Sequence, residues 1–354
     1  MPESITMLKF NSAVSQKDME GKTNFVASTA MHLKSHPIPA IRPVCNPHLL
    51  MAKDLVQLGK YLQDEKYRFT TVTPSTHCLV NTRPSSGVTS TLEGIFGWNR
   101  PFLLTSLPAT IAESALSAGL ICSEGDLYRS LVRYSTLGDN LYAHGGFPTT
   151  AADAIFFGPD TCRFVNALNR HIRPCKLLVD VGCGSGAGGL QVAHLAQKTV
   201  LTDINPKALL FAEANAQLAG YPNVELRSSD VLANVEGHPD TIIANPPYLV
   251  DPLERVYRHG GADLGTALSV RIATEAMQRL APGGRLVLYT GAPIVAGVDQ
   301  LAAAILPMVR EAAADFSYTE VDPDVFGEEL GTIPYMQVER IAAVVLCANM
   351  ADVR

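Results

Sequence analysis

The 354-residue sequence lacks the features that mark secreted and membrane proteins. Residues 1–15 contain no basic region followed by an apolar stretch, which argues against a signal peptide. The apolar segment 292–309 is interrupted by two prolines, a glycine and an aspartate, so we do not expect it to span a membrane. The seven cysteines form no C-x-x-C pair and are typical of buried thiols in a reducing compartment. The sequence therefore predicts a cytoplasmic protein.

Basic charge and metal ligands are also scarce. Lysine and arginine number 28 against 34 acidic residues, for a net charge of −6. This balance argues against a broad phosphate-binding surface, although it allows a local basic patch. His32 and His36 have helical spacing, but no glutamate or third ligand accompanies them, so we expect no metal site.

Apolar residues are abundant, and their pattern changes along the chain. They make up 47% of the sequence, enough for a sizeable core, and the length favours two domains. Residues 1–48 are polar and proline-rich near their end, and we expect a loosely ordered lead. Residues 49–150 are expected to form a smaller α+β domain that is similar to a winged helix. Residues 151–354 alternate strands and helices, the pattern of a parallel sheet.

The N-terminal domain is expected to combine helices with a hairpin. Helices are expected at 49–67, 91–96 and 111–118, a short strand at 69–72, and hairpin strands at 127–137 and 140–143. The functional interpretation is recognition of a substrate or of nucleic acid, and the alternative is a structural or dimer-forming unit. The negative net charge favours the alternative or a substrate other than nucleic acid.

The C-terminal domain is expected to be an α/β fold with a Rossmann-like sheet of seven strands. Asp160 or Thr161 is expected to cap a helix that runs to about His171. Parallel strands are expected at 177–181, 199–202, 224–227, 240–244 and 285–289, with helices at 188–195, 206–219, 267–280 and 297–310. Two late strands, near 316–321 and 338–347, are expected to complete the sheet in antiparallel orientation.

A glycine-rich turn follows the first of these strands, in the sequence Val-Asp-Val-Gly-Cys-Gly-Ser-Gly at 179–186. Glycines here let the backbone approach a ligand, and the amides of the following helix can face a polar group. Gly184, Gly186 and Gly189 also satisfy the G-x-G-x-x-G pattern of a dinucleotide-binding dehydrogenase. Asp203 ends the second strand, where it can accept from ribose hydroxyls in either class of protein. The turn therefore predicts a nucleoside-type ligand without choosing between the classes.

Two further carboxylates separate those classes, because a dehydrogenase has no particular need for either. Asp180 immediately precedes the glycine turn and can bind a ligand amino group directly or through water. Asp230 follows the third strand, where an acceptor can meet an adenine amino group. A helix cap or a solvated turn is the alternative interpretation of Asp230.

The sequence Asn245-Pro246-Pro247-Tyr248 follows the expected strand 240–244. Neither proline can donate to a ladder and each fixes its own φ, so the chain must turn rigidly at the carboxyl end of the strand. In open α/β sheets ligands bind at this edge. An amide oxygen, a proline carbonyl and a flat ring together suit a planar NH or NH2 group. An ordinary Pro-Pro loop is the alternative.

Five short motifs occur in a characteristic order. They are Asp-Val-Gly-Cys-Gly-Ser-Gly (180–186), Thr-Asp-Ile-Asn-Pro (202–206), Ser-Ser-Asp-Val-Leu (228–232), Asn-Pro-Pro-Tyr (245–248) and Leu-Ala-Pro-Gly-Gly (280–284). Over about residues 155–347 the chain resembles class I S-adenosylmethionine (SAM) methyltransferases. More narrowly, it resembles the HemK/PrmC enzymes that methylate glutamine in release factors and the related small-domain rRNA methyltransferases. Gly-Pro-Asp-Thr at 158–161 is similar to a Pro-Glu-Thr segment of HemK-type enzymes, whereas residues 1–150 do not resemble their usual helical domain.

The resemblance implies SAM as cofactor and assigns roles to individual residues. The implied cofactor-binding residues are Asp180, Gly182, Gly184, Gly186, Asp203 and Asp230. The glycines would pass close to the methionyl part, with Asp180 nearby. Asp203 would accept from the ribose hydroxyls, and Asp230 from the adenine N6. Charge-assisted hydrogen bonds of this kind are about twice as strong as neutral ones.

The acceptor side of the site is implied by the same resemblance. Asn245 and the Pro246 carbonyl would accept hydrogen bonds from the target NH2, and Tyr248 would stack on the planar target. The implied catalytic residues are Asn245, Pro246 and Tyr248, and the implied substrate-binding residues are Asn245, Pro247, Tyr248, Arg258 and His259. The polar segment 255–263 is interpreted as a lid over substrate, with a solvated loop as the alternative.

The function expected from the sequence is SAM-dependent N-methylation of a planar amide or amine nitrogen on a protein side chain or small molecule. An RNA N-methyltransferase is the alternative, and a nicotinamide-dependent oxidoreductase or a non-catalytic SAM-binding module is less favoured. The expected partner is the methyl acceptor, and we expect no association with a membrane. The sequence leaves undecided whether the apolar N-terminal domain forms a homodimer.

Overall fold

A computed structural model describes residues 50–352 of the chain. The expected lead at 1–48, including His32 and His36, lies outside the described residues. The expected boundary between domains at 150 stays a prediction.

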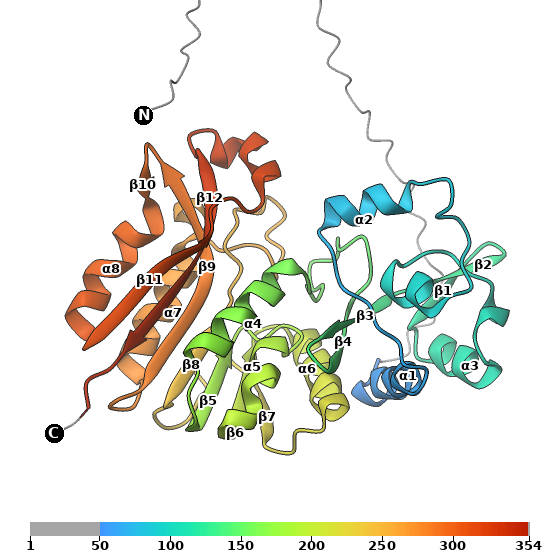
Figure 1. Cartoon of the computed structure of the whole chain (residues 1–354), viewed down its shortest axis with the longest axis horizontal. Coiled ribbons are helices and arrows are strands. Elements are labelled where there is room, and N and C mark those ends of the chain that lie inside the picture. The colour runs from blue at the N-terminus through green and yellow to red at the C-terminus, as the bar shows by residue number, and fades with distance from the viewer. Residues whose placement is uncertain (1–49, 353–354) are drawn as a thin grey trace, which may run out of the picture. The chain divides into compact units, whose positions relative to one another are not determined.

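A mostly parallel sheet dominates the C-terminal part of the chain (Figure 1). Its strands run in the spatial order β11-β12-β9-β8-β5-β6-β7, and β12 is antiparallel to both of its neighbours. The strands are β5 (Cys175–Val181), β6 (Ala196–Asp203), β7 (Val224–Ser228), β8 (Thr241–Ala244), β9 (Arg285–Val295), β11 (Asp315–Asp322) and β12 (Arg340–Asn349). The Rossmann-like sheet and its antiparallel finish are confirmed. An additional strand that the sequence did not predict, β10 (Val298–Asp299), pairs with β9.

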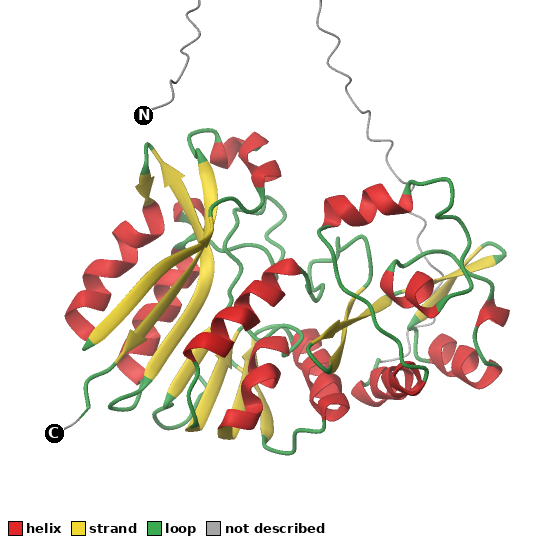
Figure 2. Cartoon of the chain, viewed as in Figure 1, coloured by secondary structure: helices red, strands yellow, loops and turns green. Residues whose placement is uncertain are grey.

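Helices pack on both faces of this sheet (Figure 2). They are α4 (Pro159–His171), α5 (Ala187–Val192), α6 (Pro206–Ala219), α7 (Ala267–Arg279) and α8 (Gln300–Ala312), with short 3-10 turns at Ala193–Leu195, Asp263–Gly265, Gly327–Gly331 and Ile333–Tyr335. Ile242 and Leu286 pack with α7 and α8, while their strand neighbours Ile243 and Val287 pack with α4. Successive strand residues point to opposite faces, so a sheet covered on both sides needs continuous apolar strands.

The start of α4 differs from the prediction. Its N-cap residue is Gly158 and not Asp160 or Thr161, although the Thr161 side chain takes part in a capping box. Pro159 occupies the first turn, and the Thr161 hydroxyl accepts a hydrogen bond from the Gly158 N–H at 3.2 Å. The side chain of Asp160 is buried instead, with 5% of the residue exposed. Its carboxylate accepts hydrogen bonds from side chains of other elements and does not cap the helix.

The topology places two ends of strands side by side. The chain leaves β5 toward β6 on one side, while β8 lies on the other side of β5. This is the switch point of an open α/β sheet, where the loops after adjacent strands diverge and leave a crevice. The glycine turn after β5 and the Asn-Pro-Pro-Tyr turn after β8 therefore meet at one edge of the sheet.

The N-terminal part contains helices and two separate hairpins. Its elements are α1 (Ala52–Asp64), α2 (Pro74–Asn81), a π-helical turn (Glu93–Gly97), a 3-10 turn (Leu104–Ser106), α3 (Ala109–Ser117), β1 (Ile121–Glu124), β2 (Leu127–Ser130), β3 (Val132–Leu137) and β4 (Asn140–Gly145). The hairpin β3–β4 is confirmed, but the strand expected at 127–137 is divided at Leu131 into β2 and β3. The sequence did not predict α2.

The short strand expected at 69–72 is wrong. The Phe69 carbonyl accepts from the N–H and hydroxyl of Thr136, at 2.8 and 3.0 Å, but the segment does not continue as a ladder. The hairpin β3–β4 is bonded to α6, because the Asn215 side-chain amide forms hydrogen bonds with both the N–H and the carbonyl of Ala143 in β4.

Across residues 50–352, every helix is too short or too polar to cross a bilayer.

Candidate active site

A cavity of about 500 Å³ opens where β5, β6 and β8 end. Its walls include the glycine turn, the ends of β6 and β7, and the Asn-Pro-Pro-Tyr turn. Segments 154–156 and 256–259 and Asp160 of α4 also line it. The volume lies within the range of small-molecule sites, and the position is the one that the topology favours for a ligand.

The glycine turn presents bare backbone to the cavity. Gly182 and Gly184 line the cavity with φ of +69° and +55°, and nothing lies within 4 Å of the position that a Cβ would take. Such backbone is open to close approach by a ligand, and side chains rarely tolerate this φ. Gly186 does not line the cavity. A Cβ there would lie 3.2 Å from the side chains of Ala212 and Leu201, so Gly186 lets α5 pack on the core.

Asp203 is fixed at the end of β6 by two backbone groups. Its Oδ2 accepts from the Gly184 N–H at 2.9 Å, and its Oδ1 accepts from the Asn205 N–H at 2.8 Å. Burial raises the pKa of this carboxyl, and the two hydrogen bonds act against that shift. Each oxygen keeps a lone pair, so the group can still accept from a ligand hydroxyl in the cavity that it lines.

Asp180 also lines the cavity, but its carboxylate is engaged by the protein. Its Oδ2 accepts from the Gly189 N–H at 2.8 Å, which joins the end of β5 to the first turns of α5. Burial raises the pKa of Asp180 to about 7, and the nearby charge of Asp203 acts in the same direction. Asp180 therefore supports the glycine turn as well as lining the cavity.

Asp230 lines the cavity and forms an ion pair that the sequence did not reveal. Its two oxygens accept from Arg271 of α7 at 2.8 and 2.9 Å. Arg271 also donates to Glu275 at 2.8 Å. The Asp230 side chain is 54% exposed, so it keeps lone pairs directed to solvent and to a ligand. The expected contact with adenine N6 stays a prediction.

The turn after β8 carries unpaired polar groups. Asn245, Pro246 and Pro247 all line the cavity. Within residues 50–352, neither the Asn245 side-chain amide nor the Pro246 carbonyl has a hydrogen-bond partner. Gly260 packs tightly behind the turn, because a Cβ there would lie 2.8 Å from the Pro247 carbonyl oxygen. The turn is therefore rigid, with two acceptors free for a ligand.

Tyr248 is buried beside these acceptors and lines the cavity. Its hydroxyl donates to the carboxylate of Asp160. The ring of Phe326 meets the Tyr248 ring edge-on, with centroids 5.8 Å apart. Sequence reasoning missed both partners, although Asp160 belongs to the Gly-Pro-Asp-Thr segment that resembles HemK-type enzymes. Phe326 lies in the β11–β12 connection and carries no motif.

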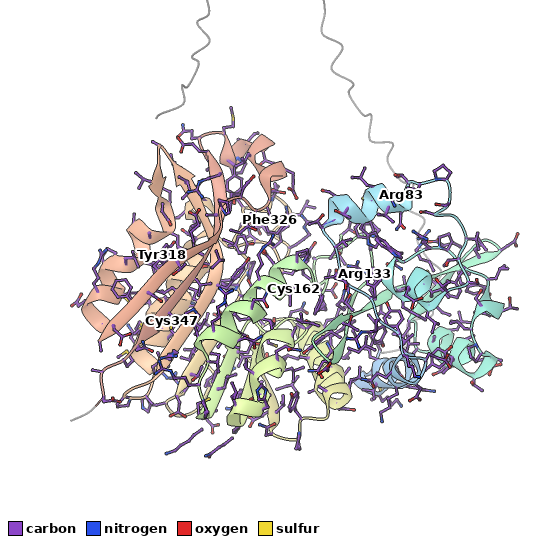
Figure 3. All side chains as sticks on the ribbon, viewed as in Figure 1. Arg83, Arg133, Cys162, Tyr318, Phe326 and Cys347 are labelled. Atoms are coloured by element: carbon purple, nitrogen blue, oxygen red, sulfur yellow. The ribbon has the colours of Figure 1, made fainter. Side chains whose placement is uncertain are left out.

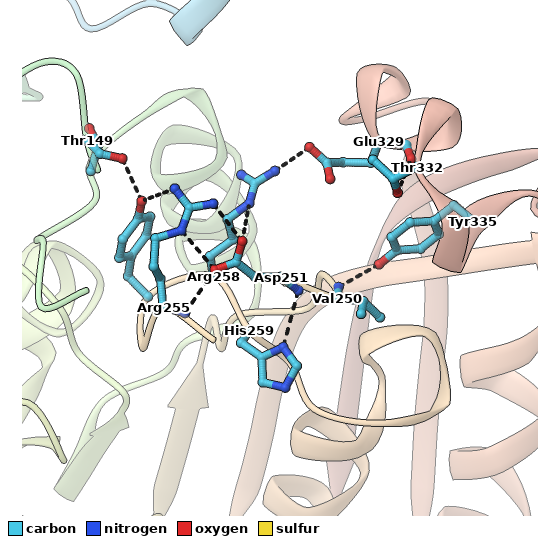
Figure 4. A network of polar contacts seen from close by, with 10 residues as sticks. Thr149, Val250, Asp251, Arg255, Arg258, His259, Glu329, Thr332 and Tyr335 are labelled. Carbon is cyan, nitrogen blue, oxygen red and sulfur yellow. Dashed lines mark hydrogen bonds and ion pairs between the residues drawn. The ribbon is translucent and has the colours of Figure 1, made fainter. Parts of the chain in front are cut away.

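The segment expected to form a lid is bound to the protein by several polar contacts (Figure 4). Asp251 accepts from Arg255 at 2.6 and 2.8 Å, and these hydrogen bonds hold the pKa of Asp251 down at about 2. Arg258 forms an ion pair with Glu329 of the β11–β12 connection. The Nδ1 of His259 accepts from the Asp251 N–H at 3.2 Å. Arg258 and His259 thus line the cavity as expected, but both are already paired within the protein.

A second contact ties this segment to the chain that precedes α4. The Tyr257 hydroxyl donates to the Thr149 carbonyl at 2.7 Å, and the Val256 N–H donates to the Ala152 carbonyl at 3.2 Å. The rings of Phe156 and Tyr257 are nearly parallel, with centroids 6.4 Å apart. Phe156 lines the cavity, whereas Phe157 is buried in the core. The two segments together form one wall of the site.

Comparison with known proteins links this cavity to a family. Residues 161–296 match the family model of the methyltransferase small domain. A release factor glutamine methyltransferase of Borreliella burgdorferi is 33% identical over 132 residues, which are 33% of this chain and 45% of that protein. One of Moorella thermoacetica is 29% identical over 268 residues, which are 70% of this chain and 91% of that protein. A ribosomal RNA small subunit methyltransferase C of Chromohalobacter salexigens is 33% identical over 115 residues, 32% of this chain and 31% of that protein.

The chain spans less than half the length of two of these three relatives. Their names include both a protein acceptor and an RNA acceptor. The matched segment contains the glycine turn, the carboxylates after β6 and β7, and the Asn-Pro-Pro-Tyr turn. The resemblance indicated by the ordered motifs is confirmed, since residues 161–296 match the model of the methyltransferase small domain.

Proposed function

We propose that the protein transfers the methyl group of SAM to a planar amide or amine nitrogen of a protein side chain or small molecule. One observation carries this proposal. The unpaired acceptors of Asn245 and Pro246 line the same cavity as the bare glycine turn and Asp203. A ligand-binding backbone and a pair of acceptors for an NH2 group thus share one site.

The residues of the cavity fit SAM. The open backbone at Gly182 and Gly184 leaves room for the methionyl part, and Asp203 can accept from the ribose hydroxyls. Asp230 borders the same cavity and can accept from the adenine amino group, in competition with Arg271. When bound, SAM supplies a methyl group on a positively charged sulfur.

The acceptor nitrogen would be aligned by the Asn-Pro-Pro-Tyr turn. Methyl transfer is an in-line displacement, so its rate depends on the direction of the nucleophile's lone pair. Hydrogen bonds from the target NH2 to Asn245 and Pro246 draw electron density onto the nitrogen and direct its lone pair into the cavity. The Tyr248 ring supplies a flat apolar surface beside it. The nitrogen can lose its proton after the methyl group arrives, so no strong general base is needed.

The charges around the cavity favour a protein side chain or small molecule over RNA. Segments 250–266 and 323–339 together contain seven acidic residues and only two arginines. Both arginines, Arg255 and Arg258, are paired with carboxylates. A phosphate backbone binds where several basic side chains are free, and these segments offer none.

The cofactor part of the proposal can be tested by calorimetry. We expect the protein to bind SAM and the Asp203→Ala variant to bind it much more weakly. Binding of NADH combined with indifference to SAM would replace the proposal by a nicotinamide-dependent oxidoreductase.

The acceptor part is tested with isotope-labelled SAM and a cell extract that is afterwards separated into protein, RNA and small molecules. Label in the protein or small-molecule fraction supports the proposal. Label in RNA, with RNA binding that weakens steeply as salt rises, would identify the alternative acceptor.

A further inference from the structure

A buried carboxylate borders the cavity and is bonded to the last residue of the Asn-Pro-Pro-Tyr turn. Asp160 of α4 accepts from the Tyr248 hydroxyl through Oδ2 and from the Tyr289 hydroxyl of β9 through Oδ1, the latter at 2.8 Å. Arg163 also donates to Oδ1 at 3.3 Å and pairs with Asp322 of β11 at 2.9 Å. One carboxylate therefore links α4, β9 and the proposed acceptor site, and Arg163 extends the network to β11.

This arrangement is costly for the fold alone. Burial of a carboxylate is unfavourable, and it raises the pKa of Asp160 against the opposing effect of the three donors. Well-packed apolar side chains of similar volume often serve stability as well as a buried charged network or better. A role in orientation accounts for the carboxylate, since its two oxygens can accept from several donors at once in fixed directions.

The ring of Tyr248 is restrained on its other sides as well. A Cβ at Gly291 would lie 2.2 Å from Cδ2 of the ring, so the ring lies directly on the backbone of β9. Phe326 contacts it edge-on. These apolar contacts restrict movement of the ring toward β9 and toward Phe326. The hydrogen bond to Asp160 fixes the position of its hydroxyl end.

We propose that Asp160, which itself borders the cavity, is a positioning residue for methyl transfer that holds the Tyr248 ring at the acceptor site and acts through that ring. Tyr289 supports it by occupying the second oxygen of the carboxylate. The proposal rests on the methyltransferase function proposed above. It predicts that loss of the Asp160 carboxylate slows transfer much more than it weakens SAM binding, because the carboxylate is bonded to the ring of the acceptor site.

The test compares Asp160→Asn and Tyr289→Phe with a matched pair elsewhere. The Tyr318 hydroxyl of β11 donates to Asp299 at 2.8 Å, and neither residue lines the cavity. Asp299→Asn and Tyr318→Phe therefore alter a tyrosine–carboxylate hydrogen bond of the same kind outside the cavity. For each variant we would measure the initial rate of label transfer from saturating SAM into a cell extract, the Kd for SAM by calorimetry, and the melting temperature.

Asp160→Asn is expected to lower the rate by about 10- to 100-fold, since small displacements of aligning groups have effects of this size. Tyr289→Phe should lower it less and leave the Kd for SAM unchanged, and Asp160→Asn should change the Kd much less than the rate. In a Tyr248→Phe background, Asp160→Asn should cause no further loss, because the link through the hydroxyl is already broken. The two control variants should keep the wild-type rate.

Equal rates for Asp160→Asn and Asp299→Asn would overturn the inference. It would also be overturned if the rate loss of the Asp160→Asn, Tyr248→Phe double variant equals the product of the two single losses. If Asp160→Asn does not fold, Tyr289→Phe takes its place in the test. Its transfer rate is then compared with that of Tyr318→Phe, and with its own effect in the Tyr248→Phe background. A wild-type protein that transfers label to no fraction refutes the proposed function itself, and with it this inference.

Discussion

Asp203 and Gly184 are joined by a hydrogen bond of 2.9 Å from the Gly184 N–H to the Asp203 carboxylate. The bond connects the end of β6 to the turn that follows β5. Because this carboxylate both shapes the glycine turn and borders the cavity, a change at Asp203 should act on cofactor binding in two ways.

Asp203→Asn is expected to weaken SAM binding by about 10- to 100-fold, which corresponds to the loss of one or two charge-assisted hydrogen bonds. An amide can accept from only one of the two backbone groups and turns a donor toward the other. Calorimetry measures the effect. Asp139→Asn, on the exposed β3–β4 turn, is the control and should bind SAM like the wild type. Equal SAM affinities for the wild type, Asp203→Asn and Asp139→Asn would show that Asp203 does not contribute to SAM binding.

Gly184→Ala is expected to reduce SAM affinity more than it reduces stability. The residue has φ of +55°, so alanine should cost about 1 kcal/mol in the free energy of unfolding. Its methyl group would also project into the open space on the cavity side of the turn. Denaturant unfolding and calorimetry would be measured on the same preparations.

Gly220→Ala is a matched control for that substitution. Gly220 ends α6 with φ of +72°, and nothing lies within 4 Å of its Cβ position. It should therefore show a similar loss of stability with unchanged SAM binding. If both variants lose SAM affinity equally, strain and not the shape of the cavity is responsible.

Asn245→Ala is expected to lower the rate of methyl transfer by about 100-fold or more while SAM binding stays intact. Loss of one preorganised hydrogen-bonding group at a reacting centre typically has an effect of this size. The rate is measured with labelled SAM and a cell extract. Asn223→Ala removes an amide that donates to the carbonyls of Ala193 and Ala196, and it serves as the control. A normal rate for Asn245→Ala would exclude the proposed role of the amide.

The contribution of two buried histidines to stability should fall as the pH is lowered from about 6.5 toward 4, while the raised pKa of Asp180 acts in the opposite direction. His77 packs against Trp98 and Phe147 near the buried Arg133 in the N-terminal part (Figure 3 labels Arg133). Burial, reinforced by Arg133, lowers the pKa of His77 from 6.5 to about 4. Burial also holds the pKa of His144 well below its usual value.

In this pH window the unfolded chain binds protons at these histidines that the folded protein excludes. The histidine contribution to the free energy of unfolding therefore decreases toward acid, by at most about 1.4 kcal/mol per pH unit for each histidine. Urea unfolding at pH 7, 6 and 5 measures the slope. His77→Phe should reduce the slope, whereas the exposed His194→Gln should leave it unchanged. A slope that is identical in His77→Phe would assign the acid sensitivity to other groups.

Local sequence signals were sufficient where the structure depends on neighbouring residues. The helix expected at 206–219 is observed as α6 with those bounds, because Pro206 starts it and Gly220 ends it in a left-handed conformation. The turns after β5 and β8 were also located from glycines and prolines whose backbone preferences are intrinsic. The strand at 69–72 was mispredicted, since its partners lie far along the chain, and the N-cap of α4 is Gly158, directly before Pro159.

The sequence by itself determined the alternation of strands and helices in the C-terminal sheet and the positions of the glycine turn and the Asn-Pro-Pro-Tyr turn. These features follow from backbone preferences and from the period of apolar residues. Only the tertiary structure decided that Arg258 is paired with Glu329, that Arg271 holds Asp230, and that Asp160 supports Tyr248. Pairing of charges and hydroxyls depends on distances between segments far apart in the chain, and a linear pattern carries no such distances.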